Sequence, residues 1–189
     1  ERTMLNFLGR LSGVATLSAR FAAAVEGTGC RVTDTRKTTP GWRRLEKAAT
    51  AAGGAVNHRM GLHDMVLVKE NHVRAAGGVR EALRAVTSRA RAAGLAVEIE
   101  VGDPEELEAA LDGAPDRILL DNMEVPALRR AVRRVREEAA DEAPLLEASG
   151  GVTLDTVRDV AETGVDLVSV GALTHSAPAL DLSMLVEDA

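Results

Sequence analysis

Basic side chains recur along this sequence at the points where short apolar runs end. The set consists of Arg36, Lys37, His58, Arg59, Lys69 and His72. Arginine presents a planar fork that fits a carboxylate or a phosphate, whereas lysine acts as a movable point charge. Any one of these residues could be an ordinary solvated charge. Their recurrence at the same structural position instead favours one pocket for a ligand with several negative charges.

Two acidic residues, Glu100 and Asp121, stand at the ends of two further apolar runs. Carboxylate oxygens are hard ligands, and Mg²⁺ is commonly held by one or two carboxylates together with phosphate oxygens and water. The pair therefore marks a candidate magnesium site. The alternative is that the two carboxylates only balance the charge of the basic set.

Glycines follow the last two apolar runs, in the strings Ser149-Gly150-Gly151 and Val170-Gly171-Ala172. Glycine lets backbone N–H groups approach an anion closely, and a following helix N-terminus adds its positive end. These glycines indicate a phosphate site. An isolated pair of glycines would more simply make a tight turn.

The elements that position these residues alternate between strands and helices after a leading helix at 1–26. The expected strands are 31–35, 55–58, 65–69, 96–101, 117–122, 145–149 and 167–171. The expected helices are 40–52, 75–93, 104–111, 125–139 and 154–163. Asp103 with Pro104 predicts one helix start and Thr153 another, because these residue types favour the first positions of helices.

The strands are short, apolar and rich in Val, Leu and Ile, as parallel strands covered by helices are. This alternation predicts an α/β fold, either an open doubly wound sheet or a barrel. A parallel barrel gathers the carboxyl ends of all its strands on one face, where its active site lies. It would unite the polar clusters in a single pocket. We therefore expect a TIM-like barrel, incomplete with six to seven strands, forming one domain over 1–189.

Composition excludes several functional classes. The chain has 189 residues, 28% of them charged, and a formal net charge of -6. That balance argues against nucleic-acid or membrane-surface binding, both of which need an excess of Lys and Arg on one face. No apolar run approaches the roughly 20 residues of a membrane helix. Cys30 is the only cysteine, which excludes an internal disulfide and favours the reducing cytoplasm.

Several long strings resemble the quinolinate phosphoribosyltransferase family, in order and over nearly the whole chain. The strings are Glu1-Arg2-Thr3 with Asn6, then 11–16, 34–41, 53–62, 69–72, 119–122, 146–151 and 169–176. The resemblance implies transfer of a phosphoribosyl group from 5-phosphoribosyl 1-diphosphate to quinolinate. The products would be nicotinate mononucleotide, diphosphate and CO₂, in de novo NAD biosynthesis.

The resemblance also implies roles for single residues. Arg36, His58 and Arg59 would bind the quinolinate carboxylates, and Lys37 and Lys69 would bridge toward the phosphoribosyl donor. The catalytic residues would be Lys37, Lys69, Glu100 and Asp121. The last two would hold Mg²⁺ and the ribose hydroxyls. The residues around the 5-phosphate would be Ser149, Gly150, Gly171 and His175.

Arg2 resembles the arginine that family members lend to the neighbouring subunit. The resemblance therefore implies a homodimer or higher homo-oligomer with a shared active site. The match begins inside a family motif, so we expect the family's N-terminal domain to be absent from this chain. Two alternatives stay open at this point. One is a paralogue associated with molybdenum uptake that uses another acceptor, and the other is a non-catalytic barrel fragment that binds phosphate.

Overall fold

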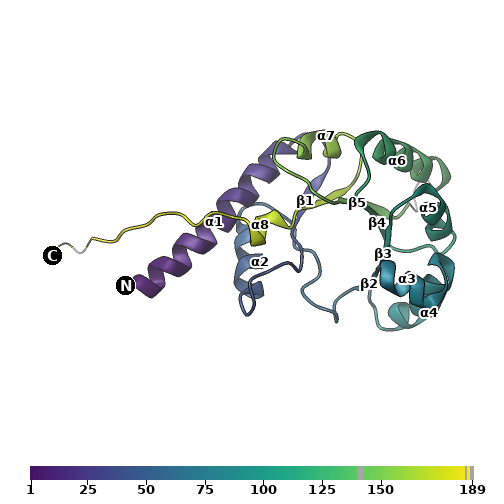
Figure 1. The fold of residues 1–189 in the computed structure, drawn as a ribbon, viewed down its shortest axis with the longest axis horizontal. Helices are drawn as coiled ribbons and strands as arrows, with labels where there is room; N and C mark the ends of the chain where they lie inside the picture. Colours follow the sequence, from purple (N-terminus) through teal and green to yellow (C-terminus); the bar gives the residue numbers. More distant parts are fainter. Residues whose placement is uncertain (140–142, 186, 188–189) are drawn as a thin grey trace.

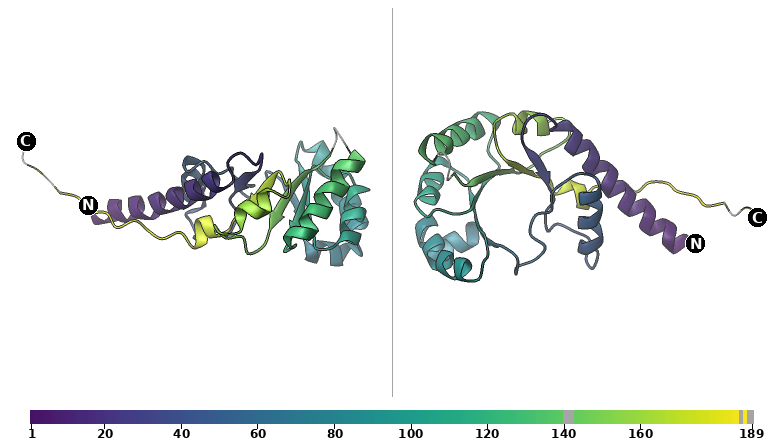
Figure 2. Two further views of the ribbon diagram at one scale, coloured as in Figure 1. Left: turned by 90° about the horizontal axis from the view of Figure 1, so that it is seen from above. Right: turned by 180° about the vertical axis from the view of Figure 1, so that it is seen from behind.

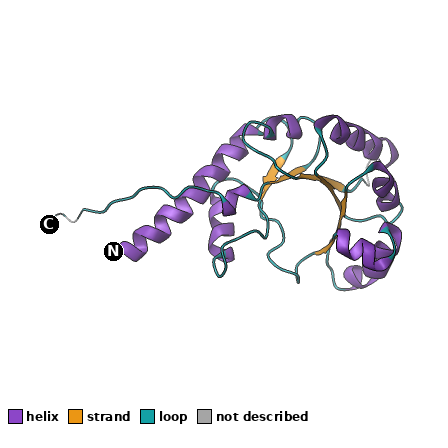
Figure 3. Cartoon of the chain, viewed as in Figure 1, coloured by secondary structure: helices purple, strands orange, loops and turns teal. Residues whose placement is uncertain are grey.

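Six parallel strands form a single curved sheet at the centre of the molecule. The computed structural model describes residues 1–139, 143–185 and 187, and Figure 3 shows the sheet of this part as an incomplete ring. The strands are β1 (Arg31–Thr33), β2 (Val66–Val68), β3 (Val97–Val101), β4 (Arg117–Asp121), β5 (Leu145–Ser149) and β6 (Leu167–Ser169), in the spatial order β1-β6-β5-β4-β3-β2. The expected incomplete barrel is confirmed.

Helices cover the outer face of the ring (Figure 1). The helices of the described residues are α1 (Arg2–Ala24), α2 (Arg43–Ala52), α3 (Glu70–Ala76), α4 (Val79–Ala92), α5 (Pro104–Leu111), α6 (Val125–Ala139), α7 (Val157–Ala161) and α8 (Ala172–His175), and α4 to α7 lie on the outer face of the ring. Helix α6 shows why they dock there. Its residues Leu128, Ala131, Val132 and Val135 are buried at helical spacing, so one apolar stripe faces the sheet.

Strand β3 explains how one strand serves both the core and the barrel interior. Successive side chains of a strand point to opposite faces. Val97, Ile99 and Val101 belong to the main hydrophobic core between sheet and helices, while Glu98 and Glu100 lie on the interior face. Burying an Ile or Val side chain contributes about 1.5–3 kcal/mol, which fixes the strand and with it the two carboxylates.

The first and last strands of the sequence, β1 and β6, are neighbours in the sheet. Arg31 of β1 pairs with Leu167 of β6. On its other side, β1 makes an isolated bridge from Thr33 to Val56. The described residues provide no strand between that bridge and β2, so the barrel stays open there.

Three expected elements are wrong in detail. Segment 55–58 forms only the bridge at Val56 and no strand. The helix expected at 75–93 is two helices, because Gly77 and Gly78 between them have φ of 88° and 153°, outside the helical region. Helix α7 begins at Val157, so Thr153 is not its cap. By contrast, Asp103 caps α5 as expected, accepting a hydrogen bond from the amide of Glu106 at 2.8 Å.

Helix α1 extends beyond the barrel, and the C-terminal segment runs along it (Figure 2). The amide of Leu180 donates to the carbonyl of Gly9 at 2.9 Å. A Cβ added to Gly13 would lie 1.9 Å from the carbonyl oxygen of Pro178, so the close approach of the two segments requires glycine. Within the described residues, no helix combines the length and apolar character needed to cross a membrane.

Candidate active site

A cavity of about 820 Å³ lies at the carboxyl ends of the strands. Eleven of the site residues predicted from the sequence line it: Arg36, Lys37, His58, Arg59, Lys69, Glu100, Asp121, Ser149, Gly150, Gly171 and His175. The twelfth, Arg2, lies in the first turn of α1 and does not line the cavity. Residues scattered along the chain thus meet because a parallel barrel gathers its strand ends.

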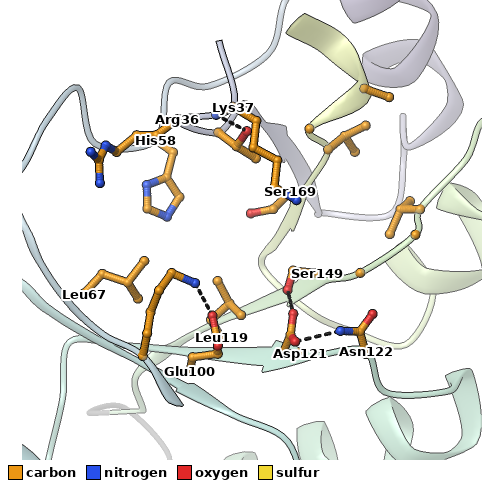
Figure 4. Close-up of a pocket in the computed structure, with 18 of the residues that line it drawn as sticks. Arg36, Lys37, His58, Leu67, Glu100, Leu119, Asp121, Asn122, Ser149 and Ser169 are labelled. Carbon is orange, nitrogen blue, oxygen red and sulfur yellow. Dashed lines mark hydrogen bonds and ion pairs between the residues drawn. The ribbon is translucent and has the colours of Figure 1, made fainter. Parts of the chain in front are cut away.

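Three basic side chains of this cavity lie opposite its two carboxylates, whereas Lys69 pairs with Glu100 on the acidic side. Figure 4 shows Arg36, Lys37 and His58 across the opening from Glu100 and Asp121. A ligand that bridged the two sides would therefore place anionic groups at one end. At the other end it would place groups that carry a metal ion or develop positive charge.

A buried ion pair holds the basic side in place. The Nζ atom of Lys47 on α2 donates to Asp34 and, at 2.8 Å, to the carbonyl of His58. The carboxylate of Asp34 also accepts from the amide of His58 at 2.9 Å and from Thr50 and Asn57. Because both carboxylate oxygens are satisfied, the buried pair is stable, and it fixes the backbone of His58 and the residues after β1.

A second buried carboxylate, Glu46 on α2, ties three segments together. It accepts from Arg10 of α1 at 2.9 Å and from the amide and hydroxyl of Thr39 at 2.9 and 2.8 Å. Arg10 also donates to the carbonyl of Ala177 at 2.7 Å. The loop that carries Lys37 is therefore fastened to α1 and to the end of α8.

The two arginines of the cavity are only partly satisfied by the protein. The Nε atoms of Arg36 and Arg59 are buried and have no hydrogen-bond partner among the described residues. Burial lowers the pKa of Arg59, and the positive charge of Arg36 lowers it further. A buried donor without a partner is costly, and two adjacent guanidinium groups repel. A ligand with two carboxylates would relieve both effects.

The acidic side of the cavity is held by neighbouring donors. Lys69 donates to Glu100, and Asp121 accepts from Ser149 Oγ at 2.5 Å and from Asn122 Nδ2 at 2.7 Å. Both carboxylates line the same cavity and supply the hard oxygen donors that Mg²⁺ prefers. These residues therefore fit a magnesium ion.

The glycine-containing end of the cavity combines tight backbone approaches with two nearby basic residues. Gly150 has φ of 105°, and a Cβ there would lie 2.2 Å from Asn122 Oδ1. A Cβ on Gly171 would lie 3.1 Å from His175 Nε2 and 3.2 Å from Lys37 Cδ. A side chain at either position would therefore crowd its neighbours, and most severely at Gly150.

Comparison with known proteins identifies the family of this chain. The family model for the quinolinate phosphoribosyl transferase C-terminal domain matches residues 14–185. The chain belongs to the quinolinate phosphoribosyltransferase family. It is 48% identical over 184 residues to a nicotinate-nucleotide pyrophosphorylase (carboxylating) of Mycobacterium leprae, covering 97% of this chain and 63% of that protein. A probable enzyme of the same name from Synechocystis is 42% identical, with 98% and 62% covered.

Solved structures agree with this family. The crystal structure of NadC from Streptococcus pyogenes is 38% identical, with a TM-score of 0.90 over 98% of this chain and 63% of that one. The nicotinate-nucleotide pyrophosphorylase of Francisella tularensis is 39% identical, with a TM-score of 0.88 over 97% and 63%. The chain therefore spans less than two thirds of the length of these relatives.

Two buried carboxylates lie beneath the cavity of this family member. The sequence analysis predicts no role for either of them. Glu98 on β3 and Glu147 on β5 are fully buried, and both lie close to His58. A signal for them exists in the sequence. Each glutamate interrupts an apolar strand two residues before a predicted site residue, Glu100 or Ser149, and residues two apart share a face of a strand.

His72, which the sequence grouped with the basic residues after strand ends, has a local structural role. Its Nδ1 atom accepts a hydrogen bond from the amide of Lys69 at 2.9 Å, at the start of α3. This contact stabilises the helix start. It also fixes the backbone of Lys69, whose side chain reaches Glu100.

Proposed function

We propose that this chain is the catalytic barrel of a quinolinate phosphoribosyltransferase. The reaction joins quinolinate and 5-phosphoribosyl 1-diphosphate and gives nicotinate mononucleotide, diphosphate and CO₂. The observation that carries the proposal is a pair of cavity arginines, in a member of this family, whose buried Nε atoms have no hydrogen-bond partner in the described part of the chain. Two such groups match a substrate that carries two carboxylates.

Binding of the acceptor follows from the basic side of the cavity. Arg36 and Arg59 bind the quinolinate carboxylates, with His58 beside them. Lys37 and Lys69 bridge toward the donor. Charge-assisted hydrogen bonds of this kind contribute roughly 1.5–3 kcal/mol each, and they fix the pyridine ring in one orientation.

Binding of the donor uses the other residues of the cavity. Ser149, Gly150, Gly171 and His175 surround the 5-phosphate. Glu100 and Asp121 would contact the ribose hydroxyls and would hold a magnesium ion. When bound, Mg²⁺ neutralises negative charge that develops on the departing diphosphate. The carboxylates in turn favour the positive charge that develops on the ribose.

The chemistry then requires orientation and no covalent intermediate with the protein. The pyridine nitrogen forms a bond to the anomeric carbon while the bond to the diphosphate oxygen breaks. The N-ribosylated ring is a pyridinium, which accepts the electron pair released when the 2-carboxylate leaves as CO₂, and the ring carbon then takes a proton. Holding both reactants in line supplies much of the rate enhancement.

The proposal extends to assembly and location. Arg2 lies outside the cavity of its own chain, which is compatible with a contribution to the pocket of a second copy. We therefore propose a homodimer or higher homo-oligomer with a shared site. We also propose that the protein works in the cytoplasm. Sedimentation of the purified protein and exchange of subunits between wild-type and Arg2→Ala chains would test the assembly.

The decisive experiment is release of CO₂ from labelled quinolinate by the full-length protein that contains this chain. Release that requires quinolinate, the phosphoribosyl donor and Mg²⁺ together is the expected result. A folded full-length protein that releases no CO₂ would contradict the proposal and favour an acceptor other than quinolinate. The same assay on residues 1–189 alone would show whether the barrel turns over by itself or is a non-catalytic phosphate-binding fragment.

A further inference from the structure

The imidazole of His58 lies between two buried carboxylates at the floor of the cavity. Its Nε2 atom is 3.0 Å from Glu98 Oε2 and 3.5 Å from Glu147 Oε1. Its Nδ1 atom accepts a hydrogen bond from the amide of Arg59 at 2.7 Å. Both ring nitrogens therefore have contacts within the protein. Nε2 faces the two carboxylates, and Nδ1 faces the backbone of Arg59.

These contacts select one form of the neutral ring. A nitrogen that accepts a hydrogen bond carries no proton, so in the neutral ring the proton is on Nε2, which faces the carboxylates. The three groups also have the spacing of a metal site, since their ligand atoms lie within 4.8 Å of one another. A protonated ring nitrogen is not a metal ligand, so the contact to Arg59 argues against that use.

The two carboxylates differ in how well the protein satisfies them. Glu147 accepts from Arg117 at 2.8 Å and from Ser169. Neither carboxylate oxygen of Glu98 accepts a well-aligned hydrogen bond from the described residues, although its side chain is fully buried. A buried carboxylate without hydrogen bonds lowers the free energy of unfolding. Glu98 lies within ion-pair distance of His58. This contact indicates that Glu98 positions the imidazole ring and does not stabilise the fold.

We infer that Glu98 is a positioning residue for acceptor binding. It holds His58 with Nε2–H toward the barrel floor, which leaves Nδ1 to fix the amide of Arg59 and so to aim the Arg59 guanidinium into the cavity. The inference rests on the proposed function for its kinetic test, because that test uses quinolinate. Its spectroscopic and stability tests do not use the substrate.

The first test compares Glu98→Leu with Glu98→Gln in the full-length protein. Leucine removes the carboxylate that lies 3.0 Å from the Nε2 atom of His58, and the KM for quinolinate should rise about tenfold or more. The kcat and the KM for the phosphoribosyl donor should change less than about threefold. Glutamine keeps a polar oxygen that faces the ring, so Glu98→Gln should retain a quinolinate KM close to that of the wild type.

Thermal stability separates positioning from a purely structural role. Replacing an unsatisfied buried charge by an apolar side chain is often neutral or stabilising, so the Tm of Glu98→Leu should not fall. Thr163→Val is the matched control, because Thr163 is buried and lies outside the cavity. It should leave both KM values unchanged. An unchanged quinolinate KM in Glu98→Leu would overturn the inference, as would a fall in kcat and Tm without a change in KM.

Nitrogen NMR tests the ring directly and remains informative if Glu98→Leu does not fold. The chain has four histidines, so the loss of one signal set in His58→Gln assigns His58. The neutral His58 ring of the wild type should carry its proton on Nε2 and none on Nδ1, and Glu98→Gln should keep this tautomer. A protonated Nδ1 in the wild type would overturn the inference. If the wild-type protein does not turn over quinolinate, that result contradicts the proposed function and not the further inference. The NMR pattern still tests whether His58 is positioned as inferred.

Discussion

Buried polar atoms of charged side chains in this chain divide into those that the protein satisfies and those that it does not. Asp34 and Glu46 accept several hydrogen bonds each and hold the loop that precedes α2. Arg36 and Arg59 keep buried Nε atoms without partners among the described residues. The first pair maintains the shape of the cavity, and the second pair is available to a ligand.

Arg59→Ala should therefore weaken quinolinate binding much more than donor binding. Loss of a charge-assisted hydrogen bond costs about 1.5–3 kcal/mol, so the quinolinate KM should rise roughly tenfold to a hundredfold. Steady-state kinetics with each substrate varied in turn would measure this. Arg80→Ala is the control, because Arg80 makes an exposed ion pair with Asp112 and should change neither KM. An unchanged quinolinate KM in Arg59→Ala would refute the acceptor assignment.

Cys30 should react with thiol reagents very slowly in the folded protein. Burial raises the pKa of its thiol to about 12 from 9.0, with a further contribution from the charge of Asp166. The thiolate is the reactive form, and at pH 8 its fraction is about a thousandfold lower than that of a free thiol. Labelling kinetics in buffer and in denaturant would check this. Equal rates in the two conditions would contradict it.

The raised pKa of Cys30 also predicts how the stability of the protein changes at alkaline pH. A thiol whose pKa is raised on folding contributes stability that is fully present below about pH 9 and is lost as the pH rises toward 12. Chemical unfolding of Cys30→Ala should therefore show a smaller loss of stability between pH 9 and pH 11 than the wild type. A parallel loss in both proteins would show that other groups dominate there.

At the scale of the elements, the sequence predicts best where one strong local signal decides the structure. The Asp103-Pro104 start of α5 and the apolar stripe of α6 are such signals, and both elements form as expected. Segment 55–58 reads as a strand from its composition, yet only Val56 pairs. Its neighbours instead bond to the buried Asp34, a tertiary interaction that local pattern does not encode.

The site was predictable in its composition but not in its internal contacts. Spacing after strand ends identifies the residues that line the cavity, because barrel topology brings strand ends together. Spacing does not reveal which neighbour each residue touches. It therefore missed Glu98, whose partner His58 lies 40 residues earlier in a different segment. Pairings of this kind depend on the three-dimensional register of strands that are distant in the sequence.

Contact between α1 and the C-terminal segment depends on a small residue at Gly13. A Cβ there would meet the backbone of Pro178 at 1.9 Å, so Gly13→Ala should force the two segments apart. The expected loss is about 1–3 kcal/mol in the free energy of unfolding. Thr16→Ala, on an exposed face of the same helix, should change it by less than about 0.5 kcal/mol. Urea unfolding of both variants would measure the difference, and equal stabilities would show that this contact is not formed in solution.

At the scale of the whole molecule, the cavity is completed by both ends of the chain. Residues after β1 supply Arg36 and Lys37, while residues after β6 supply Gly171 and His175. β6 is also the strand that joins β1 to β5. Both the cavity and the pairing of β1 with the rest of the sheet therefore depend on β6 and the residues that follow it.

A chain that ends at Gly164 should consequently lose cooperative folding. Without β6, strands β1 and β5 lack their shared neighbour, and apolar residues of the core stay exposed. Calorimetry should show no cooperative transition for this chain, whereas a chain that ends at Leu185 should keep one. A cooperative transition in the shorter chain would show that β2 to β5 with their helices form an independent unit.

The pairing of Arg31 with Leu167 also has a consequence for synthesis. A ribosome that adds about 5–20 residues per second needs on the order of ten seconds between producing these two partners. During that interval the first strand leaves the exit tunnel with no neighbour on that edge. The nascent protein is then open to chaperone binding or to pairing with another unfinished copy. Its yield in a cell should therefore depend on translation speed and chaperone supply more strongly than the stability of the finished barrel would indicate.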